Sequence, residues 1–251
     1  MSQLAQRLFM ASGGKKDSTY VDDVFSNYLY KGNGSTTGDS KAINNGIKLG
    51  NSNFGNSVYF GGSGDYLSIP YSSDYQWNNQ PWTLEYWVNA NAFGASSNSN
   101  SNMVGYSAPG GGEYWSFGAK TNRTVEWYYW SNSQQRLTTT TTISTGQWNH
   151  LAFTYDGTTM TIWINGVSSA TGAVQGTVST LVSSGFSLGI GRVTNADFNG
   201  YISNVRITKG QALYTSNFTP STDPFTTTSQ GATASNVKLL CCNKDTVTGS
   251  T

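Results

Sequence analysis

Short runs of alternating apolar and polar residues, separated by glycine-containing turns, follow one another from residue 57 to residue 208, and a last run, NVKLLCC, follows a connection rich in Pro, Thr and Ser. Residues 81–90, PWTLEYWVNA, alternate as a half-buried strand does. The pairs Asp156-Gly157 and Asn165-Gly166 are each flanked by alternating hydrophobic residues, which predicts two tight hairpins. Because no helical period intervenes between these short strands, the pattern predicts an all-β antiparallel sandwich or barrel.

The low charge of the chain argues against several classes of partner. The 251 residues include 14 Lys and Arg against 13 Asp and Glu, so no cationic field exists to hold a nucleic-acid backbone. No segment approaches the roughly 20 apolar residues of a membrane span. The first residues, MSQLAQRLFMASGGKK, carry Arg7 inside their only hydrophobic stretch, so we expect no signal peptide.

The chain divides into three predicted parts. Residues 1–56 are expected to be an N-terminal docking segment and extended arm with one or two strands. Residues 57–225 carry the strand pattern of the sandwich, and residues 226–251 are expected to be a C-terminal connection and a final strand. Within that strand, Cys241 and Cys242 are adjacent, which predicts two free thiols on opposite faces.

Three segments together resemble the laminin-G-like, concanavalin-A-like lectin superfamily: residues 81–90, 146–167 and 187–214. The second is GQWNHLAFTYDGTTMTIWINGV, and the third contains F-x-G-x-I-x-x-V-R-I. The resemblance covers roughly residues 57–225 and implies a jelly-roll of two curved antiparallel sheets packed face to face. The residues expected near its core are Leu84, Tyr86, Val88, Leu151, Phe153, Ile162, Ile164, Leu188, Ile190, Ile202, Val205 and Ile207.

A second resemblance concerns the arm and the C-terminal part of the chain. The arm, YVDDVFSNYLYKGNGS…INNGIKLG, is similar to a leader on virion proteins of marine, especially cyanobacterial, tailed phages. The segments ITKGQALYTSNFTPSTDPF and LLCC also look like laminin-G-like proteins of that group. This resemblance implies a virion protein on the particle exterior, made in the host cytoplasm, whose partners are other virion proteins or copies of itself.

Aromatic residues cluster in two neighbouring predicted strands, and sugars are commonly held by aromatic faces together with planar polar side chains. Alternation places Trp127 and Tyr129 on one face of their strand and Tyr128 and Trp130 on the other. One set should be core, and the other could either bind a glycan, with Arg123 or Arg136 beside it, or be covered by the arm or a partner. The candidate glycan-binding residues are Trp87, Tyr114, Trp115, Trp127, Tyr128, Trp130 and Arg123.

Catalytic chemistry finds little support in the sequence. The three glutamates, Glu85, Glu113 and Glu126, each lack a second carboxylate within four residues, whereas sandwich hydrolases place a carboxylate pair on one strand. His150 lies within a predicted strand, and no G-x-S-x-G elbow accompanies it, so a structural histidine is expected. We therefore expect no enzyme.

Calcium is the one cofactor that the superfamily resemblance raises, because many relatives hold an ion near the rim of the sandwich. Asp65, Asn195 and Asp197 are the donors that this chain offers there. The sequence has no acidic cluster at these positions, so the expectation is no cofactor apart from such a calcium ion.

The leading hypothesis is a non-enzymatic phage virion structural protein: a capsid decoration, knob or fibre component. Its sandwich would serve adhesion to host-surface glycans or stabilisation of the shell. The alternative is a carbohydrate-binding module or adhesin that is not tied to a virion, and a glycoside hydrolase ranks below both.

Overall fold

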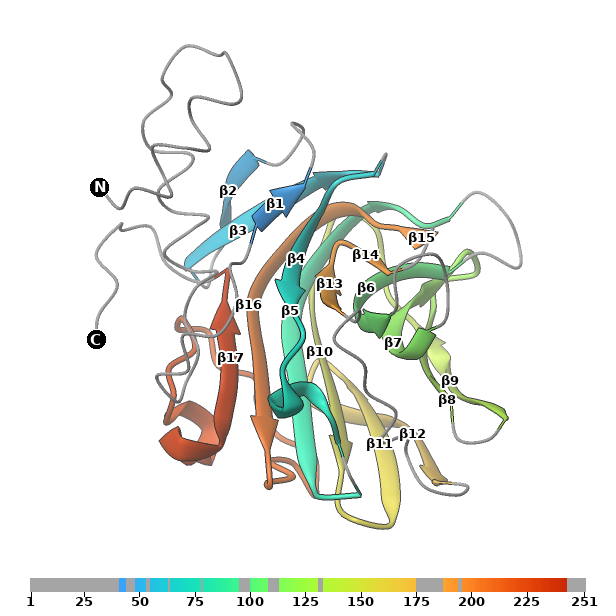
Figure 1. Ribbon diagram of the computed structural model, residues 1–251. Helices are drawn as coiled ribbons and strands as arrows, with labels where there is room; N and C mark the ends of the chain where they lie inside the picture. Colours follow the sequence, from blue (N-terminus) through green and yellow to red (C-terminus); the bar gives the residue numbers. More distant parts are fainter. Residues whose placement is uncertain are drawn as a thin grey trace.

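Seventeen β-strands and three single-turn 3-10 helices form the described part of the chain, and that part contains no α-helix. The computed structural model (Figure 1) describes residues 41–43, 48–52, 55–62, 64–77, 79–94, 100–107, 113–130, 133–174, 187–193 and 196–242. None of the helices in this part is long and apolar enough to cross a membrane. The all-β prediction is confirmed.

Two antiparallel sheets pack against each other as a sandwich. In spatial order, sheet A contains β1 (Lys41–Ile43), β4 (Tyr66–Pro70), β13 (Ser187–Ile190), β6 (Asn100–Ser107), β7 (Glu113–Lys120), β8 (Thr124–Trp130) and β9 (Gln134–Thr142). Sheet B contains β12 (Val167–Ala173), β11 (Thr159–Ile164), β10 (Trp148–Tyr155), β5 (Trp82–Ala92), β16 (Asn199–Lys209), β3 (Gly55–Gly61) and β2 (Lys48–Ser52).

Smaller elements complete the architecture. The strand β17 (Val237–Cys241) pairs with β16 in sheet B, which confirms the predicted final strand. A short hairpin of β14 (Arg192–Val193) and β15 (Ala196–Asp197) lies against β6. The 3-10 helices are η1 (Ser73–Tyr75), η2 (Ser229–Gly231) and η3 (Ala234–Asn236).

The sandwich strands extend beyond residues 57–225. The predicted arm contributes β1 and β2, which pair with β4 in sheet A and with β3 in sheet B. The arm therefore supplies one edge strand to each sheet, consistent with the one or two strands predicted for it. Residues 1–40 lie outside the described residues.

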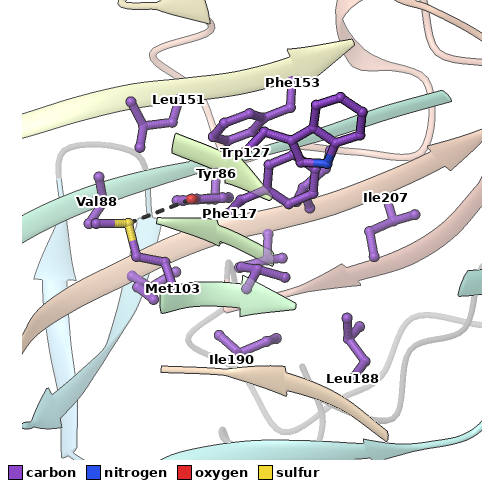
Figure 2. Close-up of a cluster of buried hydrophobic side chains, with 14 of the residues drawn as sticks. Tyr86, Val88, Met103, Phe117, Trp127, Leu151, Phe153, Leu188, Ile190 and Ile207 are labelled. Carbon is purple, nitrogen blue, oxygen red and sulfur yellow. Dashed lines mark hydrogen bonds between the residues drawn. The ribbon is translucent and has the colours of Figure 1, made fainter. Parts of the chain in front are cut away.

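The core lies between the two sheets and follows from strand alternation. All twelve residues predicted near the core are buried, and none is more than 6% exposed. Figure 2 shows part of this core, including Tyr86, Phe153 and Ile207. On β5, for example, Leu84 and Tyr86 pack in the core, whereas Glu85 points to the outer face of sheet B. Burial of this apolar surface is the main stabilising contribution to the fold.

Both predicted hairpin turns are present, at residues 156–157 and 165–166. Asn165 and Gly166 have positive φ angles of 52° and 80°, the conformation that a tight hairpin requires. The amide oxygen of Asn165 accepts a hydrogen bond from the backbone N–H of His150 at 2.8 Å. A Cβ added to Gly166 would clash with the carbonyl oxygen of Phe218, whose backbone N–H donates to the carbonyl oxygen of Gly166 at 2.9 Å, so this turn also supports the chain around residue 218.

The two cysteines are free and buried, but they do not lie on opposite faces of the strand. Cys242 has a positive φ of 61°, which interrupts strand alternation directly after β17. Both side chains therefore join the main core, and their sulfur atoms are 3.6 Å apart.

The segment 210–236, which we call the C-terminal segment, crosses the outer face of sheet B. There Phe225 and Ala232 pack with Trp87 and Leu240, and Tyr214 packs against Trp163. Sheet B is consequently covered on both faces over much of its centre.

Candidate functional site

An outward-facing group of polar and aromatic side chains lies on three adjacent strands of sheet A. On β8, Trp127 packs in the core, so its neighbours Glu126 and Tyr128 point outward. The antiparallel register places Thr138 of β9 opposite Glu126, and Arg136 opposite Tyr128. We call the following set the β7–β9 face: Lys120, Glu126, Tyr128, Arg136 and Thr138.

The carboxylate of Glu126 organises this face. Its Oε2 lies 2.7 Å from Nζ of Lys120 and accepts a hydrogen bond from Oγ1 of Thr138 at 3.1 Å. Its Oε1 accepts a hydrogen bond from Nη1 of Arg136. The guanidinium carbon of Arg136 also lies 4.9 Å from the centre of the Tyr128 ring, a cation–π geometry.

Exposure differs sharply within this cluster. The Glu126 side chain is 1% exposed, whereas those of Lys120 and Arg136 are 30% and 45% exposed. The carboxylate therefore lies beneath the two cations, and the solvent meets mainly N–H donors and the Thr138 hydroxyl. A planar guanidinium held in place by a buried anion is suited to recognising hydroxyl or oxyanion groups.

Two of the predicted glycan-binding residues belong to the core, which corrects that part of the prediction. Trp127 stacks on Tyr129 with ring centroids 4.1 Å apart, and Trp115 lies 5.5 Å from Phe117. Trp127 is 1% exposed and Trp115 is 3% exposed, so neither ring face is open to a sugar. The prediction was wrong because aromatic content alone does not show which face of a strand is buried.

The other predicted residues have different positions. Trp87 is also buried, because the C-terminal segment covers it on the outer face of sheet B, and this too is a correction. Tyr128 is on the β7–β9 face, although Arg136 lies over its ring. Arg123 is exposed in the turn between β7 and β8, with a φ of 69°.

Tyr114 and Trp130 lie on β7 and β8, respectively. Their side chains fall outside the described residues, so their assignment to a glycan surface stays a prediction.

The predicted calcium donors have protein partners of their own. Oδ2 of Asp65 accepts a hydrogen bond from the backbone N–H of Gly61 at 2.8 Å, and Oδ1 of Asp197 lies 3.4 Å from Nε of Arg192. Asn195 lies outside the described residues. Within the described ranges, no group of three His, Cys, Asp or Glu side chains could hold a metal ion. Asp65 and Asp197 alone do not fit a calcium ion, which requires six to eight oxygen ligands.

A second polar cluster is buried on the outer face of sheet B, and we call it the clamp: Glu85, His150, Arg206 and Tyr214. Oε1 of Glu85 accepts hydrogen bonds from Nε of Arg206, at 2.8 Å, and from its Nη2. Oε2 accepts one from the Tyr214 hydroxyl at 2.7 Å and lies 3.2 Å from Nε2 of His150. His150 is fully buried, as expected for a structural histidine.

The clamp also holds the C-terminal segment. Nη1 of Arg206 donates to the carbonyl oxygens of Thr226 and Ser229, each at 2.8 Å. The guanidinium carbon lies 4.8 Å from the centre of the Phe225 ring. One arginine thus connects β16 to β5 and to the chain that crosses over both.

Acid should destabilise the protein through Glu85. Burial alone would raise the pKa of Glu85, but the Arg206 charge and the hydrogen bonds from His150 and Tyr214 outweigh it and lower the pKa to about 2. Because the folded-state pKa is lowered, this stabilisation is present above the unfolded pKa, about 4.3, and is lost as the pH falls towards 2. We expect a loss on the order of 3 kcal/mol across that window.

Thermal unfolding followed by tryptophan fluorescence between pH 7 and pH 2 measures this effect. Glu85→Gln should flatten the decline below pH 4.5. An equally steep decline in Glu85→Gln would contradict the assignment.

The two buried glutamates are on opposite sides of the sandwich. Glu85 lies on the outer face of sheet B and Glu126 on the outer face of sheet A, so the core separates them. A glycosidase needs two carboxylates within about 10 Å across one sugar. Glu85 and Glu126 therefore cannot form such a pair.

Sequence reasoning did not identify Lys120 and Thr138 as members of a site. They lie 18 residues apart, and only the pairing of β7, β8 and β9 brings both to Glu126. A signal was present in the sequence, because β9 reads QQRLTTTTT, with Leu137 as its one apolar residue, and follows the aromatic strand β8.

Comparison with known proteins gives a family and a fold. A laminin G-type family model, described as the concanavalin A-like lectin/glucanases superfamily, matches residues 60–214, which is more than half of the chain. The comparison with curated protein sequences gave no match.

Several solved structures are similar to this one. Domain 4 of AbnA, a GH43 extracellular arabinanase from Geobacillus stearothermophilus solved with arabinotriose, has a TM-score of 0.56 at 20% identity, covering 70% of this chain and 85% of that one. The binding domain of Paraclostridial Mosquitocidal Protein 1 has a TM-score of 0.56 at 11% identity, covering 71% and 45%. The binding domain of botulinum neurotoxin DC in complex with SialylT has a TM-score of 0.52 at 17% identity, covering 70% and 43%. This chain therefore spans less than half of each toxin chain, and the likeness concerns the fold.

Proposed function

The chain belongs to the concanavalin A-like lectin/glucanases superfamily, and from that premise we propose that it is a non-enzymatic glycan-binding protein. The observation that carries the proposal is the β7–β9 face, where Arg136 is half-exposed and is held in place by the buried carboxylate of Glu126. A binding group that is already oriented loses little conformational entropy when a ligand arrives.

The placement of the face within the sandwich supports this proposal. The C-terminal segment covers the centre of sheet B, and the β14–β15 hairpin lies over β6, so that a Cβ on Gly105 would meet Val193 at 2.7 Å. Arg136 and Thr138 of β9 lie away from both coverings and are exposed. Domain 4 of AbnA, solved with arabinotriose, and the neurotoxin DC binding domain, solved with SialylT, are precedents for saccharide recognition on this fold.

A bulky side chain placed on the β7–β9 face tests whether this face is the binding site. Thr138→Trp adds a large side chain at an exposed position of β9, and Thr171→Trp adds the same side chain at an exposed position of β12 in the other sheet. On an immobilised glycan panel, the wild type and Thr171→Trp should bind the same glycans, and Thr138→Trp should bind none. No binding by the wild type would refute the proposed function. Equal binding by all three proteins would show that glycans bind outside the β7–β9 face.

The absence of catalysis is part of the proposal. It is supported by the positions of Glu85 and Glu126 on opposite outer faces and by the ion pairs that engage both carboxylates. Incubation with a broad polysaccharide panel should release no reducing ends. Release that disappears in Glu126→Gln would instead identify a glycoside hydrolase.

We further propose that the protein is displayed on the exterior of a phage particle, as a capsid decoration, knob or fibre component. The support is the resemblance of the arm and of residues 207–225 to virion proteins of marine tailed phages. Many copies on one particle would convert weak single-site binding into useful avidity, and contacts to other virion proteins or to copies of itself would hold the protein there. Co-purification with particles at a fixed stoichiometry tests this role, whereas a free adhesin or carbohydrate-binding module would be absent from them.

Removal of calcium should leave the protein unchanged, because we propose that it requires no cofactor. The carboxylates of Asp65 and Asp197 are engaged by Gly61 and Arg192, and no acidic cluster accompanies them in the described residues. EDTA should shift the melting temperature by less than about 1 °C and leave glycan binding intact. A rise in the melting temperature with added Ca²⁺ would show that a calcium site exists and would support the site predicted from the sequence.

A further inference from the structure

The charges of the β7–β9 face indicate which class of glycan it selects. The five residues contain two cations and one anion, and the anion is buried beneath the cations. Arg123, in the turn between β7 and β8, adds a third exposed cation. Glu113, the other carboxylate on these strands, begins β7, whereas Lys120 ends it, seven residues or about 23 Å away along the strand.

The hydrogen-bonding capacity of Arg136 and Lys120 is only partly used. A guanidinium has five N–H donors, and within the described residues the side chain of Arg136 donates one hydrogen bond, from its Nη1. The ammonium of Lys120 has three donors, and among the described residues its partner is Glu126. The remaining donors belong to side chains that are 45% and 30% exposed, so they are available to a ligand.

The position of Arg136 favours an oxyanion over a neutral hydroxyl. Glu126 and the ring of Tyr128 contact the guanidinium on two sides, so the Arg136 side chain is already ordered before a ligand binds to the remaining edge of the guanidinium. A fixed guanidinium edge matches the two oxygens of a carboxylate or sulfate, and charge-assisted hydrogen bonds are about twice as strong as neutral ones.

We infer that the β7–β9 face binds an acidic glycan, with Arg136 as the principal contact to a sugar carboxylate or sulfate and Lys120 as a second cation. This inference rests on the proposed function and specifies its substrate class. Glu126 has an opposing role, because its buried charge orients Arg136 but also repels an anionic ligand.

Matched pairs of acidic and neutral saccharides test the inference. Oligogalacturonate is compared with its methyl ester, and dextran sulfate with dextran, by calorimetry on the full chain at 50 mM and 300 mM salt. We expect binding of the acidic member of at least one pair, weakened by salt, and at least tenfold weaker binding of its neutral partner. The pair that responds identifies carboxylate or sulfate as the recognised group.

Three charge variants separate recognition from structural support. Arg136→Gln should weaken binding of the acidic saccharide at least about tenfold, and Lys120→Gln should weaken it less. Glu126→Gln should strengthen binding about threefold to tenfold, because the repelling charge is removed while the amide oxygen of glutamine can still accept the hydrogen bond from Arg136. Lys238→Gln, a matched loss of charge on β17 in the other sheet, should have no effect.

The outcomes keep the two proposals apart. Binding of neutral glycans that equals or exceeds binding of the acidic ones would overturn the inference and leave the proposed function intact. Binding of neither these probes nor the wider glycan panel would remove both. Weaker acidic binding in Glu126→Gln, to the level of Arg136→Gln, would show that the cluster only supports the strands and would also overturn the inference.

Discussion

Replacement of Arg206 by methionine should lower the free energy of unfolding by about 3–5 kcal/mol. Methionine retains much of the length of the arginine stem, so little packing volume is lost, but the carboxylate of Glu85 remains fully buried without its strongest partner. The carbonyl oxygens of Thr226 and Ser229 lose their donor in the same change. Urea denaturation followed by tryptophan fluorescence measures the loss without adding salt that would screen the pair.

Two comparisons isolate the buried pair in that experiment. Arg192→Met breaks an ion pair with Asp197 whose side chains are 29% and 26% exposed, and it should cost less than about 1 kcal/mol. The double variant Glu85→Gln/Arg206→Met should cost clearly less than the sum of its single changes, because each single change leaves a buried group unpaired. A cost below about 1 kcal/mol for Arg206→Met, or strict additivity, would show that the clamp does not act as a unit.

The clamp affects which surface of the sandwich can bind a ligand, because it holds the C-terminal segment over the outer face of sheet B. If Arg206 holds the C-terminal segment, then Arg206→Met should also make residues 210–236 sensitive to limited proteolysis before the sheets unfold. The centre of sheet B would then be exposed, including the buried ring of Trp87. The attachment of this segment is therefore the physical reason why the β7–β9 face of sheet A, and not the outer face of sheet B, is the candidate surface.

The core and the hairpins could be predicted from the sequence because they depend on local patterns. Alternation on β5 identified Leu84 and Tyr86 as core residues, and Asn165-Gly166 has the backbone angles that such a pair favours. Both features need information from only a few neighbouring residues, so one sequence was sufficient.

The candidate site and the clamp could not be predicted in the same way, because they depend on strand pairing. Glu85 meets Arg206 across 121 residues and Tyr214 across 129 residues. Alternation correctly placed the side chains of Trp127 and Tyr128 on opposite faces of their strand, but it could not show which of the two faces is buried in the core. At Cys242 the alternation itself fails, because a positive φ turns the second thiol towards the first.

Replacement of Trp127 by alanine should cost about 3–5 kcal/mol of unfolding free energy, because a large core side chain is removed and its cavity collapses only partly. The ring packs against Tyr129 and lies 6.2 Å from Trp82, which belongs to the opposite sheet, so the loss affects the contact between the two sheets. Urea denaturation at 10 °C measures the change. Calorimetry on the fraction that remains folded should give an unchanged affinity for the glycan.

Thr138→Trp should show the opposite behaviour, with glycan binding abolished and the free energy of unfolding lowered by no more than about 2 kcal/mol, because position 138 is exposed and the change removes one hydrogen bond to Glu126. The two variants lie on paired strands but on opposite faces, so together they distinguish a core aromatic residue from a surface one. If folded Trp127→Ala failed to bind while Thr138→Trp bound normally, the ligand would have to reach the interior between the sheets. Recognition would then require the sandwich to open, and the β7–β9 face would be only its polar exterior.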